Sequence, residues 1–209
     1  MINWTFEAGL QTSADIVQVA TDSKKIYDLF SNENVVMTSS SHLSGTDRVN
    51  EAVSKLNLSD EDVIINIQGD EPFINPEDIN NLFDLVSKKE IAMGTLYSDL
   101  KSLDELEDSN KVKILVNDGI ASNFFRETSL VNNIFIHQGV YAFKYKTLKS
   151  FVSWQPSDNE KKYKLEQFRA LDNGIKINAI KSVSKIHLGV DTEDDLKKAN
   201  EIAKDDSYK

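Results

Sequence analysis

Residues 64–72, Ile-Ile-Asn-Ile-Gln-Gly-Asp-Glu-Pro, hold the pattern that decides the fold of this 209-residue chain. The run at 62–68 is apolar on both faces, which predicts a strand lying centrally in a parallel sheet. Ligands of open α/β sheets bind beyond the carboxyl ends of such strands. Gly69 permits a tight turn there, and Asp70 would then project into the crevice as a hard oxygen ligand. The alternative is that residues 70–72 only form a turn into the next helix.

Strands and helices alternate on both sides of this stretch. By hydrophobic period and turn residues we predict helices at 2–12, 24–30, 45–56 and 76–86 and strands at 16–20, 35–37 and 91–96. Such alternation favours an α/β fold with a doubly wound, mostly parallel sheet.

The pattern changes at Lys111, after which the chain is β-rich as far as 143. A helix at 161–171, a strand at 175–180 and a last helix at 192–203 follow. No repeat, low-complexity segment or linker rich in Pro and Gly divides the sequence. We therefore interpret residues 1–209 as a single domain with a small β-rich lobe.

Composition excludes several classes of function. Hydrophobic residues make up 40% and charged residues 28%, as in ordinary globular proteins. The net charge of −10 argues against a nucleic acid polymer as partner, although one nucleotide could bind in a local pocket. The absence of cysteine excludes disulfides and thiolate catalysis. No apolar run approaches the roughly 18 residues that cross a bilayer. No membrane association and no signal peptide are indicated, and a cytoplasmic location is expected.

A second acidic cluster, residues 189–196, follows another strand-like stretch. Asp191 or Thr192 is a natural N-cap for the last predicted helix. The other reading is that carboxylates from the two acidic segments meet at one magnesium ion. Magnesium is commonly held by one or two carboxylates together with substrate phosphates.

Arg48 is the third candidate. We predict that Gly45, Thr46 and Asp47 cap a helix, which places Arg48 in the first turn, where a cation opposes the helix dipole. Only three of the 24 Lys and Arg residues are arginines. The planar fork of arginine suits bidentate binding of a carboxylate or phosphate. The three histidines lack metal-site spacing, and no GxSxG, GxxxxGK[ST] or GxGxxG motif occurs.

Seven segments in order resemble one family, the bacterial 3-deoxy-manno-octulosonate (Kdo) cytidylyltransferases, or CMP-Kdo synthetases. The segments are ATD (20–22), SGTDR (44–48), IINIQGDEP (64–72), HQGVY (137–141), WQPS (154–157), LEQ (165–167) and GVDT (189–192). The resemblance implies a fold of the nucleotide-diphospho-sugar transferase type. It also implies transfer of a cytidylyl group from CTP to the anomeric hydroxyl of Kdo, giving CMP-Kdo and pyrophosphate for lipopolysaccharide synthesis.

The resemblance also implies the site residues. Asp70 and Asp191 would be catalytic and would bind Mg²⁺, which lowers the pKa of the attacking hydroxyl. Arg48 would hold the sugar carboxylate. The other positions that match the acidic-sugar pocket are Gln68, His137, Tyr141, Glu166 and Gln167. Members of this family are usually homodimers, so the resemblance implies a homodimer, in which residues 111–154 would form the dimerisation lobe.

The sequence departs from the family at its start. The family begins with a strand and a loop, typically IPARxxSxRLPGKPL, that holds the CTP phosphates, and Met1 aligns just after this loop. We therefore expect the first strand and the nucleotide-binding loop to be missing, which would leave two sheet edges open and could leave the chain inactive. The alternatives are a CMP-sialic acid synthetase-like enzyme, a non-catalytic acidic-sugar-binding or dimerisation protein, and a GT-A-type glycosyltransferase.

Overall fold

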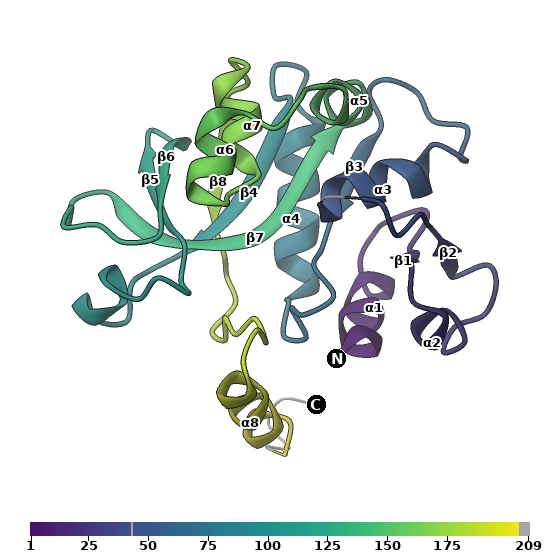
Figure 1. Ribbon diagram of the computed structural model, residues 1–209, viewed down its shortest axis with the longest axis horizontal. Helices are drawn as coiled ribbons and strands as arrows, with labels where there is room; N and C mark the ends of the chain where they lie inside the picture. Colours follow the sequence, from purple (N-terminus) through teal and green to yellow (C-terminus); the bar gives the residue numbers. More distant parts are fainter. Residues whose placement is uncertain (43, 205–209) are drawn as a thin grey trace.

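Two sheets form the framework of the computed structural model, which describes residues 1–42 and 44–204 (Figure 1). Strands β1 (Val19–Thr21) and β2 (Val35–Met37) form a parallel pair. The larger sheet has the order β3-β7-β4-β8-β6-β5, and β5 also pairs with β7. Its strands are β3 (Val63–Asn66), β4 (Met93–Ser98), β5 (Lys113–Asn117), β6 (Ile120–Phe125), β7 (Ile134–Lys144) and β8 (Ile177–Lys181).

Helices cover both faces of the large sheet, with α4 on one face and α5 to α7 on the other (Figure 1). The helices are α1 (Ile2–Leu10), α2 (Lys24–Tyr27), α3 (Gly45–Val53), α4 (Pro76–Ser87), α5 (Tyr145–Ser153), α6 (Asp158–Tyr163), α7 (Gln167–Asp172) and α8 (Glu193–Ile202), with a 3₁₀ helix η1 (Leu103–Leu106). None of these described helices is long and apolar enough to cross a membrane.

The two-residue period of β7 builds a core on each face of the sheet. Val140 and Ala142 pack with Leu82 and Val86 of α4. The intervening residues, Tyr141 and Phe143, pack on the other face against Phe151 of α5 and Phe168 of α7. A third, smaller cluster contains Phe6, Val19 and Val35 and belongs to the N-terminal part of the chain.

The α/β class is confirmed, but the expectation of a mostly parallel sheet is wrong. Among the pairings of the described strands, only β1–β2 and β4–β8 are parallel. The long strand β7 runs antiparallel between β3 and β4, which separates two strands that point the same way.

Strand β3 lies at one end of the large sheet and not at its centre, contrary to prediction. Helix α4 covers one of its faces, and α3 and α5 cover the other. The apolar residues of β3 indicate that both of its faces are covered by helices. They do not indicate how many strands pair with its edges. β1 pairs only with β2, and β3 only with β7, so each leaves one edge without a partner strand among the described residues. The unpaired edges of β1 and β3 agree with the prediction of two open sheet edges.

Local signals explain the remaining differences. The helix predicted at 161–171 is divided into α6 and α7, because Lys164 adopts a left-handed conformation with φ 54°. Helix α5 was not predicted, because no side chain caps its N-terminus and the sequence therefore lacks the usual signal for a helix start. The N-cap of α3 is Ser44, whose hydroxyl accepts a hydrogen bond from the Asp47 amide, so the predicted Gly45–Asp47 cap is corrected. Thr192 is confirmed as the N-cap of α8.

Asp78 of α4 anchors the segment that leads from β8 towards Asp191. Its side chain is fully buried and accepts hydrogen bonds from the Ser182 hydroxyl at 2.5 Å and the Val183 amide at 2.7 Å. We expect Asp78→Ala to lower the free energy of unfolding in urea by about 3 kcal/mol, because two buried donors lose a charged acceptor. The exposed residue Asp84 on the same helix gives the control, since Asp84→Ala should change stability by less than about 0.5 kcal/mol.

Candidate active site

Asp70 and Asp191 come together at the carboxyl end of β3. Asp70 follows β3 in the chain, and the Val190 amide donates a hydrogen bond of 2.9 Å to the Asp70 carbonyl oxygen. This bond holds the residue before Asp191 against the Asp70 turn. Burial raises the pKa of the Asp70 carboxyl, and the nearby Asp191 carboxylate raises it further. The two distant acidic segments therefore lie together, and the magnesium ion expected between their carboxylates stays a prediction.

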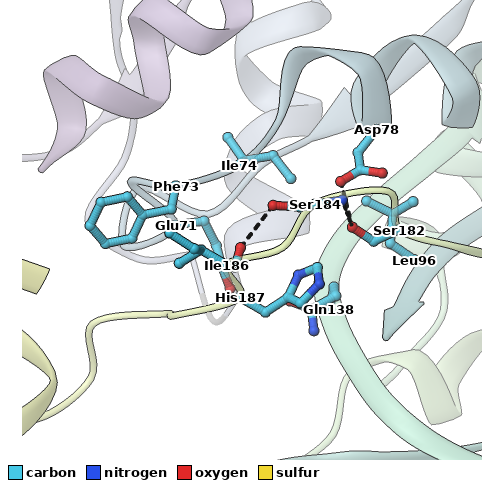
Figure 2. Close-up of a pocket in the computed structure, with 10 residues that line it drawn as sticks. All are labelled: Glu71, Phe73, Ile74, Asp78, Leu96, Gln138, Ser182, Ser184, Ile186 and His187. Carbon is cyan, nitrogen blue, oxygen red and sulfur yellow. Dashed lines mark hydrogen bonds between the residues drawn. The ribbon is translucent and has the colours of Figure 1, made fainter. Parts of the chain in front are cut away.

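Glu71 is a third acidic group at this place, and the sequence did not single it out. Burial, then the charges of Asp70 and Asp191, raise the pKa of Glu71 to about 7. A Cβ atom at Gly189 would lie only 3.2 Å from Glu71 Oε1, so a glycine gives this side chain room. Figure 2 shows Glu71 among the residues that line a cavity of about 10 Å³, which is room for one water molecule.

The donor set at this site suits a hard, partly solvated cation. In the described part of the chain, no three side chains of the His, Cys, Asp or Glu type are grouped to hold a metal ion by themselves. The close pair of Asp70 and Asp191 is what magnesium commonly uses when substrate phosphates and water complete its coordination. The Asp191 carboxylate also raises the pKa of Asp70, and a cation between the two carboxylates would offset this repulsion.

Gln68 lies where α3 and β7 approach the end of β3. A Cβ atom at Gly45 would lie 3.1 Å from Gln68 Nε2, and one at Gly139 would lie 4.0 Å from Gln68 Cγ. Both glycines therefore border the Gln68 side chain. Because Gln68 is two residues before Asp70, this contact connects the acidic pair to the polar residues of α3 and β7.

A polar network joins α3, β3 and the start of α7. Thr46 Oγ1 donates to Glu166 Oε1 at 2.7 Å, and Asn66 Nδ2 donates to Thr46 Oγ1 at 3.2 Å. Burial raises the pKa of Glu166. Within the described residues, Glu166 Oε2 and Gln167 Nε2 are buried without a hydrogen-bond partner. An unsatisfied buried polar atom costs about 1–3 kcal/mol, so a ligand that pairs with both would recover this energy.

His137 and Tyr141 lie beside this network because β7 bulges between them. Tyr141 is opposite Thr95 of β4, but Gln138 is opposite the next residue, Leu96. An uninterrupted strand would separate residues four apart by about 13 Å, whereas the centroids of these two rings are 5.4 Å apart. Burial, and then the Glu166 charge, raise the pKa of Tyr141.

Arg48 points elsewhere. Its guanidinium donates to Thr38 Oγ1 at 2.7 Å, to the Ser39 carbonyl at 3.3 Å and to Asp22 Oδ2 at 3.0 Å. Among the described residues, no hydrogen bond joins it to the network around Glu166. The structure thus brings Tyr141 next to His137 and Glu166 and places Gln68 beside Gly45 and Gly139. Gln167 is buried next to Glu166 in the chain, while the fork of Arg48 is engaged by the N-terminal part of the chain.

The sequence analysis did not place several residues in the site, among them Thr46, which it predicted only as part of a helix cap. Thr46 and Asn66 stand within the quoted motifs, so the motifs could have indicated them. Thr95 lies inside an ordinary apolar strand and gives no signal of its own. The further residues are Glu71 and Arg169.

His137 should make the stability of the fold depend on pH. Burial lowers its pKa to about 3, whereas an imidazole in the unfolded chain titrates near 6.5. Below about pH 6.5 the unfolded state binds more protons, so the free energy of unfolding falls as the pH falls. Between pH 6.5 and 5 the loss should reach about 2 kcal/mol.

Urea unfolding at pH 8 and pH 5 measures this effect. We expect the difference between the two pH values to be about 2 kcal/mol smaller in His137→Gln than in the wild type. Gln11→Ala, an exposed change elsewhere in the chain, should keep the wild-type difference. Equal differences in the wild type and His137→Gln would contradict the prediction.

Several known proteins with similar sequences share one description. A family model described as cytidylyltransferase matches residues 1–177. The 3-deoxy-manno-octulosonate cytidylyltransferase of Haemophilus influenzae (strain 86-028NP) is 35% identical over 222 residues, covering 97% of this chain and 87% of the relative. The protein of the same description from Francisella tularensis subsp. novicida (strain U112) is 34% identical over 218 residues, with 97% and 87% covered.

Solved structures agree with this grouping. A CMP:2-keto-3-deoxy-manno-octonic acid synthetase complexed with CTP superposes with a TM-score of 0.86 at 29% identity, covering 97% of this chain and 86% of that one. The 2-C-methyl-D-erythritol 4-phosphate cytidylyltransferase of Francisella tularensis has a TM-score of 0.66 at 17% identity, with 95% and 86% covered. The second likeness concerns the fold alone, and it agrees with the nucleotide-diphospho-sugar transferase type expected from the sequence.

Proposed function

This chain belongs to the cytidylyltransferase family of nucleotidyltransferases, and we propose that it transfers the cytidylyl group of CTP to the anomeric hydroxyl of Kdo. The products are CMP-Kdo and pyrophosphate, and CMP-Kdo serves lipopolysaccharide synthesis. The observation that carries the proposal is the meeting of an acidic pair, Asp70 and Asp191, with a buried polar network that keeps two atoms unsatisfied.

We infer that Asp70 and Asp191 bind Mg²⁺. The ion would polarise the phosphoryl oxygens and lower the pKa of the hydroxyl that attacks. The two carboxylates hold negative charge at the end of β3, where Gln68 leads into the polar network. Their part is to orient the triphosphate beside the acceptor sugar, since phosphoryl transfer depends mainly on positioning and charge neutralisation.

The polar network is the proposed acceptor site for an acidic sugar. Glu166 Oε2 can accept a hydrogen bond and Gln167 Nε2 can donate one, and neither has a partner within the described residues. Together they suit the hydroxyl groups of a sugar, which both donate and accept. Tyr141 stays protonated at neutral pH and can donate, because its pKa is raised.

Arg48 would bind the carboxylate of the sugar. Its guanidinium now donates to Asp22, so a sugar carboxylate would replace one carboxylate partner with another. Exchange of like partners keeps the charge-assisted hydrogen bond. Both side chains of this ion pair are partly exposed, so a carboxylate from solvent can reach them.

We also propose a homodimer that uses the β-rich residues 111–154, by analogy with the family. We place the reaction in the cytoplasm, because CTP is supplied there.

Pyrophosphate release tests the proposed function. The purified 209-residue chain is mixed with CTP, Kdo and Mg²⁺, and release above a control with EDTA is expected. N-acetylneuraminate in place of Kdo tests the CMP-sialic acid synthetase alternative. Calorimetric binding of Kdo without release from either sugar would support the non-catalytic sugar-binding alternative and would overturn the proposal.

A further inference from the structure

Thr95 lies at the point where β7 bulges against β4, and its side chain is fully buried. Its hydroxyl oxygen is 2.8 Å from the Val140 carbonyl oxygen and 2.9 Å from His137 Nε2. The Gln138 carbonyl oxygen is 3.4 Å away. One hydroxyl therefore faces two backbone acceptors and one ring nitrogen.

The hydrogen bonds of the Thr95 hydroxyl determine which nitrogen of the His137 ring carries a hydrogen. A threonine hydroxyl has one hydrogen to donate and lone pairs to accept with. Carbonyl oxygens only accept, so the Thr95 hydrogen must go to Val140. If the Thr95 hydrogen pointed to His137 instead, the lone pairs of the Thr95 hydroxyl oxygen and the Val140 carbonyl oxygen would face each other at 2.8 Å. His137 Nε2 then meets a lone pair of Thr95 and must itself carry a hydrogen.

The second ring nitrogen is left as an acceptor. Burial lowers the pKa of His137 to about 3, so the ring is neutral and holds only one hydrogen near pH 7. With that hydrogen on Nε2, the Nδ1 atom presents a lone pair. Within the described residues no hydrogen bond reaches Nδ1. The ring is flanked by the Phe124 ring in an edge arrangement, at a centroid distance of 5.1 Å, and by the Tyr141 ring.

We propose that Thr95 is a positioning residue that fixes His137 in its Nε2-protonated tautomer, so that Nδ1 accepts a hydrogen bond from a hydroxyl of the acidic sugar. The tautomer follows from the contacts of this chain alone. The identity of the ligand rests on the proposed function. Thr95 also bonds to a carbonyl within the bulge, and it thereby couples the backbone shape of β7 to the orientation of the ring.

Nitrogen-15 NMR of the histidine rings tests the tautomer without any turnover. His137→Gln identifies the His137 signals among those of the three histidines. In the wild type at pH 7 we expect Nε2 to have the shift of a protonated nitrogen and Nδ1 that of a bare one. Thr95→Ser, which keeps the hydroxyl, should keep this pattern. Thr95→Val, which has nearly the same shape but no hydroxyl, should show a mixture of both tautomers. A protonated Nδ1 in the wild type would overturn the proposal.

Substrate dependence tests the role in recognition. For Thr95→Val we expect the KM for Kdo to rise about tenfold, the loss of one hydrogen bond, while the KM for CTP stays within about twofold of the wild-type value. Thr95→Ser should restore most of the affinity. If Thr95→Val alters the tautomer but leaves the KM for Kdo unchanged, the recognition role is wrong.

The two proposals fail in different ways. A wild type with the expected tautomer but no pyrophosphate release would contradict the proposed function and leave the tautomer in place. Active enzyme with the other tautomer would overturn the Thr95 proposal alone. Should Thr95→Val fail to fold, the wild type still decides, because a protonated Nδ1 in its spectrum overturns the proposal.

Discussion

Replacing Asp70 or Asp191 by asparagine is expected to lower kcat/KM for pyrophosphate release by about 100-fold or more. A catalytic metal ion supplies several kcal/mol of charge stabilisation, and each 1.4 kcal/mol is about a factor of ten in rate. Asparagine keeps the shape of the side chain but removes the negative charge that attracts the ion. A steady-state assay over a range of Mg²⁺ concentrations measures the loss and shows whether more metal reverses it.

The same two variants should fold at least as well as the wild type. The charge of Asp191 raises the pKa of Asp70, and both charges raise the pKa of Glu71, so removing one relieves repulsion. Glu193→Gln is the matched control, because this exposed carboxylate lies in the same acidic segment. It should retain wild-type activity. An Asp70→Asn or Asp191→Asn variant with full turnover would remove that residue from the site.

Arg169→Met is expected to lower the free energy of unfolding by about 3 kcal/mol, because it leaves two partly buried carboxylates without their buried partner. Only 2% of the Arg169 surface is exposed. Its guanidinium donates to Glu160 Oε2 at 2.8 Å and Oε1 at 2.5 Å, and to Asp47 Oδ1 at 3.3 Å. It also lies over the Phe151 ring, 4.6 Å from its centroid.

The loss of stability should extend to helices α6 and α3, because Glu160 and Asp47 each also contribute to a helix N-terminus. Glu160 completes the capping box of α6 with Ser157, and Asp47 stands in the first turn of α3. Arg169→Lys should lose less, since lysine keeps the charge but cannot form the bidentate pair. In a double-mutant cycle, Glu160→Gln should cost much less in the Arg169→Met background than alone. Lys161→Met, an exposed change, is the control. Similar losses from Lys161→Met and Arg169→Met would contradict a buried ion-pair hub.

Sequence reasoning found the parts of the site that follow from strand ends and helix caps. Asp70 was predicted because an apolar strand ends just before it. Asp191 was predicted from a second acidic segment, although the strand expected directly before that segment is absent and β8 already ends at Lys181. Thr192 was found as a cap by its residue type. In these cases the signal and the structure lie within a few residues of each other.

What the sequence did not show depends on contacts between distant segments. The apolar residues of β3 report that both faces are covered, and an end strand flanked by helices satisfies this as well as a central one. The break between α6 and α7 needs a left-handed Lys164, which residue preferences do not favour. The tautomer of His137 depends on Thr95, 42 residues away in the chain. The pocket roles of Glu166 and Gln167 came from family resemblance and not from their own pattern.

The separation of β1 and β2 from the large sheet has a consequence for the cooperativity of unfolding. The first part of the chain has its own small cluster around Phe6, Val19 and Val35, and no strand pairing ties it to the rest of the described structure. Segments with few contacts across their boundary open at a lower free energy than the global transition. We therefore expect the amide hydrogens of Val19 and Val35 to exchange with solvent earlier than those of Ile114 and Ile177. Thr5 Oγ1 donates to the Glu71 carbonyl at 3.2 Å, so each such partial opening would also release the backbone that carries the acidic pair.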